Sequence, residues 1–137
     1  MAYSNYYARI SMALSGIKSS FGTVFRFAPS LIYSGLIIIF QALAWFQAWY
    51  IKHNLSGDIL VLHYNVDFGI DLVGDPRQIY LFPLLGLGIY LLNLIILASL
   101  YKDKNFKIFT HLLLGAAVLF ALFLVLALLS VYLINFR

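Results

Sequence analysis

The chain has 137 residues, of which 64% are apolar and only 10% are charged. A soluble domain carries about 25% charged and about 45–50% apolar residues, so this composition argues against one. The apolar content also excludes intrinsic disorder, which goes with few apolar residues and high charge. The absence of cysteine excludes disulfides, thiolate metal centres and cysteine nucleophiles. A net charge of +4, from scattered cations, is too small for a nucleic-acid-binding surface.

Three long stretches of the chain contain no charged residue. They comprise 25 residues after Arg26, 24 after Arg77 and 29 after Lys107. A helix rises about 1.5 Å per residue, so each stretch can cross a hydrocarbon core about 30 Å thick. We therefore predict an all-α integral membrane protein with a single membrane domain over the whole chain, 1–137. Its transmembrane helices are expected at 29–51, 79–101 and 106–135.

Apolar residues of the segment 1–26 recur at steps of three or four, which places them on one helical face: Ile10, Leu14, Ile17, Phe21 and Phe25. Arg9 and Lys18 fall largely elsewhere. Such a segment can lie in the headgroup layer, so we predict an N-terminal interfacial helix. The alternative is a partly ordered tail whose cations only set the topology, because Gly16 and Gly22 weaken a helix.

Lys and Arg are distributed unequally over the segments that flank the predicted helices. The segment 1–26 has three cations and no acid, and the connection before the third helix has three cations at or near it. The long connection 52–77 has two cations against four Asp. Because cytoplasmic segments carry an excess of Lys and Arg, we expect the N-terminus inside and the long connection and C-terminus outside.

The connection 52–77 is the part of the chain that is richest in polar residues. It contains a short β-favouring run, Ile59–Leu62, and turn signals at Gly69 and Gly74. A structureless loop of this length is uncommon, so we predict an ordered outer loop with a short extended segment that caps the helix ends. We expect His63 and Asn65 to pair with buried backbone of the loop, and Phe68 and Ile70 to add apolar contact.

A longer pattern within and after this loop resembles a known family. The pattern is Ile59-Leu60-Val61-Leu62-His63-Tyr64-Asn65, then Phe68-Gly69-Ile70-Asp71 and Gly74, then Leu81-Phe82-Pro83-Leu84. It resembles an uncharacterised bacterial membrane domain that also forms the N-terminal part of SdpI-type immunity proteins, which protect Gram-positive cells from a secreted toxin. The resemblance covers residues 58–97, and this chain lacks the prolines that the family commonly has before the His. It implies a bacterial cytoplasmic (inner) membrane protein with an ordered loop, whose motif residues are His63, Tyr64, Asn65, Gly69, Asp71, Gly74 and Pro83.

A metal site in the loop is the alternative to a structural role. His63, Asp67 and Asp71 are spaced by four residues, and on a helix they would share a face and offer metal ligands. However, Gly69 and the β-favouring run argue against a helix, and the spacing matches no closed zinc pattern. We therefore expect a structural role for these residues, with ligand contact as a second reading, and neither a metal nor a cofactor.

Three polar residues lie within the predicted membrane helices: Gln41 in the first, Asn93 near the middle of the second and His111 one turn into the third. Uncharged polar side chains in such helices commonly bond to a neighbouring helix, and glycines such as Gly86 and Gly88 allow close contact. No charged residue lies in mid-span, which argues against a proton relay. A packing role is therefore expected first.

No sequence pattern of a known catalytic centre is present. The chain has no phosphate loop, dinucleotide fingerprint, Ser-His-Asp order or paired catalytic carboxylates, so we do not expect an enzyme. The leading hypothesis is a non-enzymatic binding, accessory or immunity-like signalling module. Its expected partners are the lipid bilayer and a protein partner or second copy, not nucleic acid. The alternative is a subunit of an oligomeric transporter or channel, suggested by Gln41, Asn93 and the glycines.

Overall fold

The computed structural model describes residues 15–16, 18–67 and 69–136. In chain order the elements are α2 (Ala28–Asn54), β1 (Leu60–Asn65), β2 (Gly69–Gly74), the 3-10 helix η1 (Pro76–Tyr80), α3 (Leu81–Ser99) and α4 (Phe106–Phe136). Residues 15–26, apart from 17, are also helical. The helices Ala28–Asn54, Pro76–Ser99 and Phe106–Phe136 are long and apolar enough to cross a membrane. The prediction of three such helices is confirmed, but the fold is not wholly helical, because the loop forms a two-stranded sheet.

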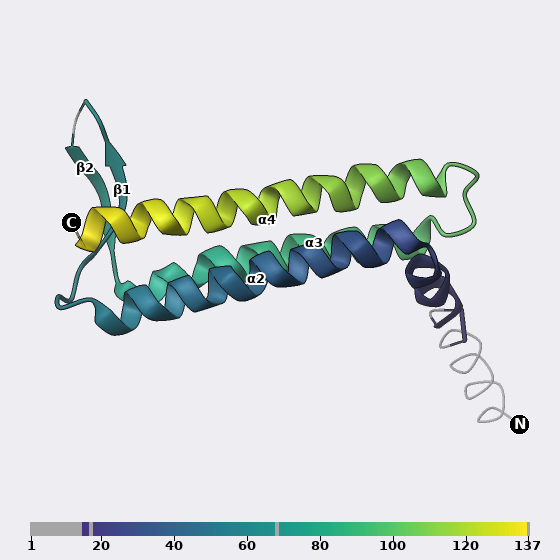
Figure 1. Ribbon diagram of the computed structural model, residues 1–137, viewed down its shortest axis with the longest axis horizontal. Helices are drawn as coiled ribbons and strands as arrows, with labels where there is room; N and C mark the ends of the chain where they lie inside the picture. The colour runs from purple at the N-terminus through teal and green to yellow at the C-terminus, as the bar shows by residue number, and fades with distance from the viewer. Residues whose placement is uncertain (1–14, 17, 68, 137) are drawn as a thin grey trace, which may run out of the picture.

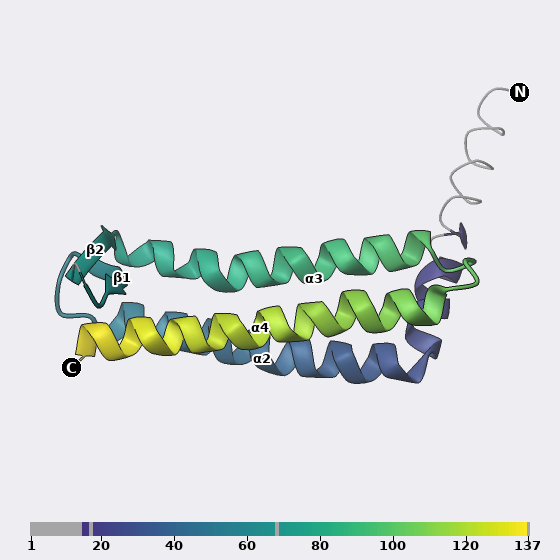
Figure 2. The ribbon, with the colours of Figure 1, turned by 90° about the horizontal axis from the view of Figure 1, so that it is seen from above.

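The three long helices lie side by side, with α2 and α4 running in one direction and α3 in the other (Figures 1 and 2). The β1–β2 hairpin and the C-terminal end of α4 lie at one end of the bundle, which we call the hairpin end. The N-terminal helix and the α3–α4 connection lie at the other end (Figure 1). We call this the basic end, because Lys102, Lys104 and Lys107 follow one another there. The strands run across the direction of the helices, and the hairpin tip reaches past α4 (Figure 1).

The contact between α2 and α4 follows a heptad pattern. Their buried residues are Ser30, Ser34, Ile37, Gln41, Ala44, Ala48 and Ile51 in α2, and Thr110, Leu114, Ala117, Ala121, Leu124, Leu128 and Val131 in α4. In both helices the steps alternate between four and three, which is the spacing of a left-handed coiled coil. Small residues at many of these positions let the backbones approach closely. Leu, Ile and Phe occupy the outer faces, where they are exposed, as suits helices surrounded by lipid.

Helix α3 begins later than the sequence predicts. The residues before it, Pro76–Tyr80, form the 3-10 helix η1, and Asp75 caps η1 by accepting a hydrogen bond from the backbone N–H of Arg77 at 2.7 Å. Pro83 has no N–H to donate to the carbonyl of Ile79, so an α-helical bond is lost at this point. The chain tightens to 3-10 geometry, as is common at helix ends.

Aromatic rings gather at both ends of the bundle. At the hairpin end Trp45 stacks on Tyr80, with ring centroids 5.9 Å apart, and Tyr50 meets Tyr132 edge to face. At the basic end Phe27 packs edge to face on Phe106. Trp and Tyr rings favour the boundary between lipid and water, so the rings at the hairpin end fit the level at which the helices would leave a bilayer there.

The N-terminal helix packs on the basic end through Val24. This side chain is fully buried among residues of all three long helices, which include Ile37, Leu97 and Leu114. Phe21 and Phe25 flank it and are only partly buried. Residues 15–16 and 18–26 are helical, and their buried side centres on Val24, which was not among the apolar residues expected on that face. Ile10, Leu14 and Ile17 lie outside the described residues, and the position in the headgroup layer stays a prediction.

The three long helices meet closely at Gly86 of α3. One turn earlier, the Pro83 carbonyl accepts a hydrogen bond from Nε2 of Gln41 in α2. A Cβ atom at Gly86 would lie 2.6 Å from Cδ1 of Leu124 in α4 and 2.8 Å from Oε1 of Gln41. At Gly88 a Cβ atom would meet nothing within 4 Å.

Gly86→Ala is therefore expected to destabilise the bundle by about 1–3 kcal/mol, the usual cost of overpacking a well-packed contact. Gly88→Ala is the matched control and should leave stability unchanged or slightly raised, because alanine favours a helix over glycine. Unfolding of both variants in mixed detergent micelles, followed by circular dichroism, measures the difference. Coincident unfolding curves for Gly86→Ala and the parent would contradict this description of the contact.

Candidate functional site

The hairpin forms because its turn residues suit a tight reversal. β1 and β2 are antiparallel, with Asn65 opposite Gly69. Oδ1 of Asn65 accepts a hydrogen bond from the backbone N–H of Asp67 at 2.8 Å, a typical Asx turn. Gly69 has φ +81°, a conformation that glycine adopts without steric cost. Asn65 thus pairs with exposed turn backbone, so the expectation that it pairs with buried backbone is wrong.

His63 also has a different partner from the one predicted. Its Nδ1 lies 2.7 Å from Oδ1 of Asp71, across the hairpin, and 61% of the side chain is exposed. The expected bond to buried loop backbone is therefore wrong. An exposed pair of this kind contributes at most about 1 kcal/mol. Among the described residues no group of three or more His, Cys, Asp or Glu is placed to hold a metal ion.

A side chain that the sequence reading did not single out ties the hairpin to the bundle. Oδ1 of Asn135, near the end of α4, accepts a hydrogen bond from the backbone N–H of Val61 at 3.0 Å. Its Nδ2 donates to the carbonyl of Val61 at 2.8 Å and also to the carbonyl of Val131 at 2.8 Å. The carboxamide therefore pairs with β1 as a neighbouring strand would. The available signal was a polar residue at the far end of a long apolar run, but nothing local identified its partner.

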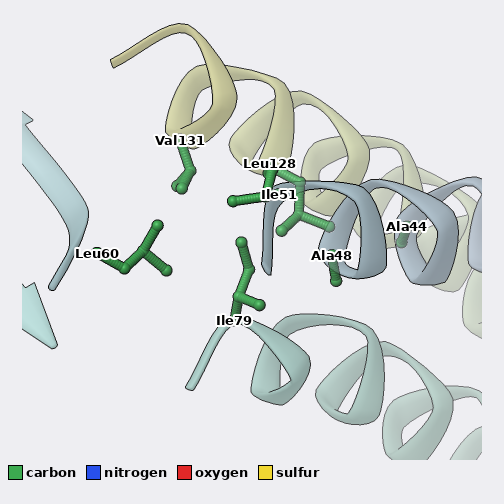
Figure 3. Packing of buried hydrophobic residues seen from close by; sticks show 7 residues of the cluster. All are labelled: Ala44, Ala48, Ile51, Leu60, Ile79, Leu128 and Val131. Carbon is green, nitrogen blue, oxygen red and sulfur yellow. The ribbon is translucent and has the colours of Figure 1, made fainter. Parts of the chain in front are cut away.

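Leu60 buries the base of the hairpin at the same place. Its side chain is fully buried, and it faces Ile51, Ile79, Leu128 and Val131, which come from α2, η1 and α4 (Figure 3). The expectation that the run Ile59–Leu62 covers the helix ends thus holds for Leu60, whereas Ile59 is 64% exposed.

Gly74, at the end of β2, packs closely against η1. A Cβ atom there would collide with the side chain of Gln78 and lie 3.0 Å from Cδ1 of Leu62. Gln78 thus packs directly against the backbone at Gly74. The base of the hairpin is therefore fixed from both strands.

A groove of about 650 Å³ runs between the hairpin, the start of α3 and the last turns of α4. Most of its lining is apolar, and the polar groups among it are His63, Tyr64, Gln78 and Ser130. Hydrogen bonds engage two of these four side chains, since His63 pairs with Asp71 and the Ser130 hydroxyl donates to the Leu126 carbonyl. The groove has room for a side chain or an acyl chain but offers no catalytic arrangement.

The outer part of the hairpin is exposed and apolar. Val66 at the tip is 89% exposed, and Ile70, Leu72 and Val73 of β2 are each more than half exposed. Among the described residues β2 makes extensive contact only with β1, whereas β1 also packs on α4. At its base the β1 edge is thus covered by α4, whereas the β2 edge has no neighbouring strand among the described residues and is open.

The three polar residues predicted within the membrane helices serve contacts between helices. Nδ2 of Asn93 donates to the carbonyl of Leu113 in α4 at 3.0 Å, the kind of bond expected for it. Nδ1 of His111 lies 3.0 Å from the hydroxyl of Tyr33 in α2, a partner that sequence spacing did not indicate. With Gln41 on the Pro83 carbonyl, all three predicted intramembrane residues bridge two helices.

No protein-family model, curated protein or solved structure matches the chain. The resemblance over residues 58–97 therefore stays a prediction.

Asn135→Leu is expected to destabilise the hairpin by about 1–3 kcal/mol, because it leaves the N–H and C=O of Val61 without protein partners. The matched control is Asn54→Leu at the end of α2, where the side chain bonds only the carbonyl of Tyr50 in its own helix. Amide hydrogen exchange in detergent should show faster exchange over 60–74 in Asn135→Leu alone. Equal protection of this segment in parent and Asn135→Leu would show that the tether is not needed.

Proposed function

We propose that this chain is a non-enzymatic, multi-pass protein of a bacterial cytoplasmic membrane that binds a protein partner through its hairpin. The observation that carries the proposal is a small sheet that is fixed at its base and exposed at its outer part. Asn135 and Leu60 hold the base, while Val66 and Leu72 are exposed apolar side chains outside the long helices. An exposed apolar surface of this kind is typical of an interaction site.

A fixed base favours binding. A partner that docks on a preformed sheet does not have to order it first, so less conformational entropy is lost on association. The proposed role is that of an accessory or immunity-like signalling module, in line with the family that residues 58–97 resemble. The lipid bilayer is the second partner, through the exposed apolar faces of the helices.

The intramembrane polar residues support binding over transport. Gln41 and Asn93 donate to backbone carbonyls of neighbouring helices, and His111 meets Tyr33. These contacts hold the helices together, and each residue that suggested a pathway has a polar atom bonded to a neighbouring helix. A transporter or channel subunit is accordingly the less favoured function.

The distribution of charge supports an orientation with the hairpin outside. The hairpin end holds four Asp against two cations over 52–77, and the basic end holds Lys102, Lys104 and Lys107. We propose a cytoplasmic N-terminus and basic end, with the C-terminus outside, on the rule that cytoplasmic connections are rich in Lys and Arg.

Single cysteines at Ser56 and Asn105 test this orientation, because the parent has no cysteine. A membrane-impermeant thiol reagent on intact cells should label Ser56→Cys and spare Asn105→Cys, and both should label after permeabilisation. Labelling of Asn105→Cys alone on intact cells would reverse the orientation.

Photo-crosslinking tests the docking surface. A photoreactive amino acid in place of Leu72, on the hairpin, should give a protein adduct of defined mass in intact cells. The same amino acid in place of Leu85, an exposed residue of α3, should give lipid adducts only, because it faces the bilayer. The proposal fails if both positions give the same products.

A further inference from the structure

The open edge of β2 carries backbone groups without a partner strand. Both hydrogen-bonding groups of Val61 point to Asn135, away from β2. Val73 lies opposite Val61 in the antiparallel register. Residues that face each other in such a ladder direct their N–H and C=O groups either toward each other or away from each other. The N–H and C=O of Val73 therefore point outward, to the uncovered edge.

An open edge of this kind is a template for another strand. Its side chains offer contact area as well, because Ile70, Leu72 and Val73 are exposed. The register shifts on either side of His63 leave Leu62 on β1 and Asp71 on β2 each without an opposite residue, so each strand has a one-residue bulge at this point. The bulge in β2 limits the length of strand that can pair, so a short segment suits this edge better than a long one.

The negative charge of the hairpin determines which kind of partner strand can pair with β2. Residues 58–75 contain four Asp and neither Lys nor Arg, and two of the four, Asp71 and Asp75, lie on or beside β2. A second copy paired antiparallel on the same edge would bring the two Asp71 side chains close together, and like charges across strands are destabilising. A segment with Lys or Arg between its apolar residues would place opposite charges there instead.

We infer that the open edge of β2 binds a short, extended, cationic segment of the partner protein as a third antiparallel strand. This inference rests on the proposed function, and it names the surface and the chemistry of the partner. The backbone of Val73 supplies hydrogen bonds, the exposed apolar side chains supply contact, and the aspartates supply the preference for cations.

The probe is a synthetic seven-residue peptide that alternates lysine with valine, labelled with a fluorophore. The full chain is held in nanodiscs of phosphatidylcholine, which carries no net charge, and empty nanodiscs report binding to lipid. Anisotropy should show binding that exceeds the empty nanodiscs and weakens as salt is raised, since exposed charges are screened. A peptide with glutamate in place of lysine should bind at least about tenfold more weakly, a difference of about 1.4 kcal/mol.

Val73→Pro tests the backbone donor directly. Proline removes the outward N–H and is tolerated where that N–H does not serve the existing ladder, so the hairpin should persist. Val73→Ala is the matched control, because it shortens the same side chain and keeps the N–H. The affinity for the lysine peptide should fall about tenfold in Val73→Pro and change less than about threefold in Val73→Ala, since one hydrogen bond and the adjoining ladder are lost only in the first.

N-methylated peptides keep the test independent of folding. Methyl groups on alternate nitrogens block one edge of the peptide, and methyl groups on the other set block the opposite edge. Strand addition requires that one set abolishes binding while the other leaves it within about threefold. Equal binding of both sets, or of the lysine and glutamate peptides, would overturn the inference.

Failure of this inference is distinguishable from failure of the proposed function. If no peptide binds while the Leu72 photo-crosslink still gives a discrete protein adduct, the hairpin docks its partner by another surface and strand addition is wrong. If the crosslink also fails, the docking function falls with it.

Discussion

The structure depends on the pairing of one carboxamide with one backbone unit, Asn135 with Val61. A two-stranded hairpin by itself is at best marginally stable in water. Here its inner edge is completed by a side chain that accepts from the N–H and donates to the carbonyl, and the adjacent Leu60 is fully buried. The stability of the hairpin therefore depends on its attachment to α4. Loss of the tether would leave the hairpin held only by the packing of Leu60 and by its connections.

This tether requires a long fourth helix. α4 has 31 residues, about 46 Å at 1.5 Å per residue, whereas α3 has 19. A hydrocarbon core of about 30 Å is crossed with several turns to spare, and Asn135 lies in the last turn of α4. The final turns of α4 thus form a platform for β1. The heptad contact between α2 and α4, with its small residues, fixes the position of α4. Gln41, Asn93 and His111 add hydrogen bonds between helices, which matter because lipid provides no hydrophobic driving force for helices to associate.

The sequence predicts the parts of this fold that depend on local composition. Long charge-free stretches identify the three helices, and the run Ile59–Leu62 indicates β1. It does not predict β2, where Asp71 interrupts a short apolar run between two glycines. It also misassigns His63, because the partner is eight residues away across a turn whose register local spacing does not define. Asn135 is harder still, since its partner lies 74 residues away and only the packed bundle brings them together.

The two edges of the sheet differ in whether their backbone groups are paired, because β1 lies beside α4 and β2 does not. At Val61 the β1 edge is paired with Asn135 of α4, so no further strand can pair there. The β2 edge is left open, and it combines exposed apolar residues with aspartates rather than with the lysines that often protect such edges. Negative charge discourages pairing between copies of the chain and leaves the edge receptive to a strand of opposite charge. Because β1 is anchored to α4 and β2 has an exposed edge with aspartates, the sheet can add a cationic strand at β2 without any change in the helical bundle.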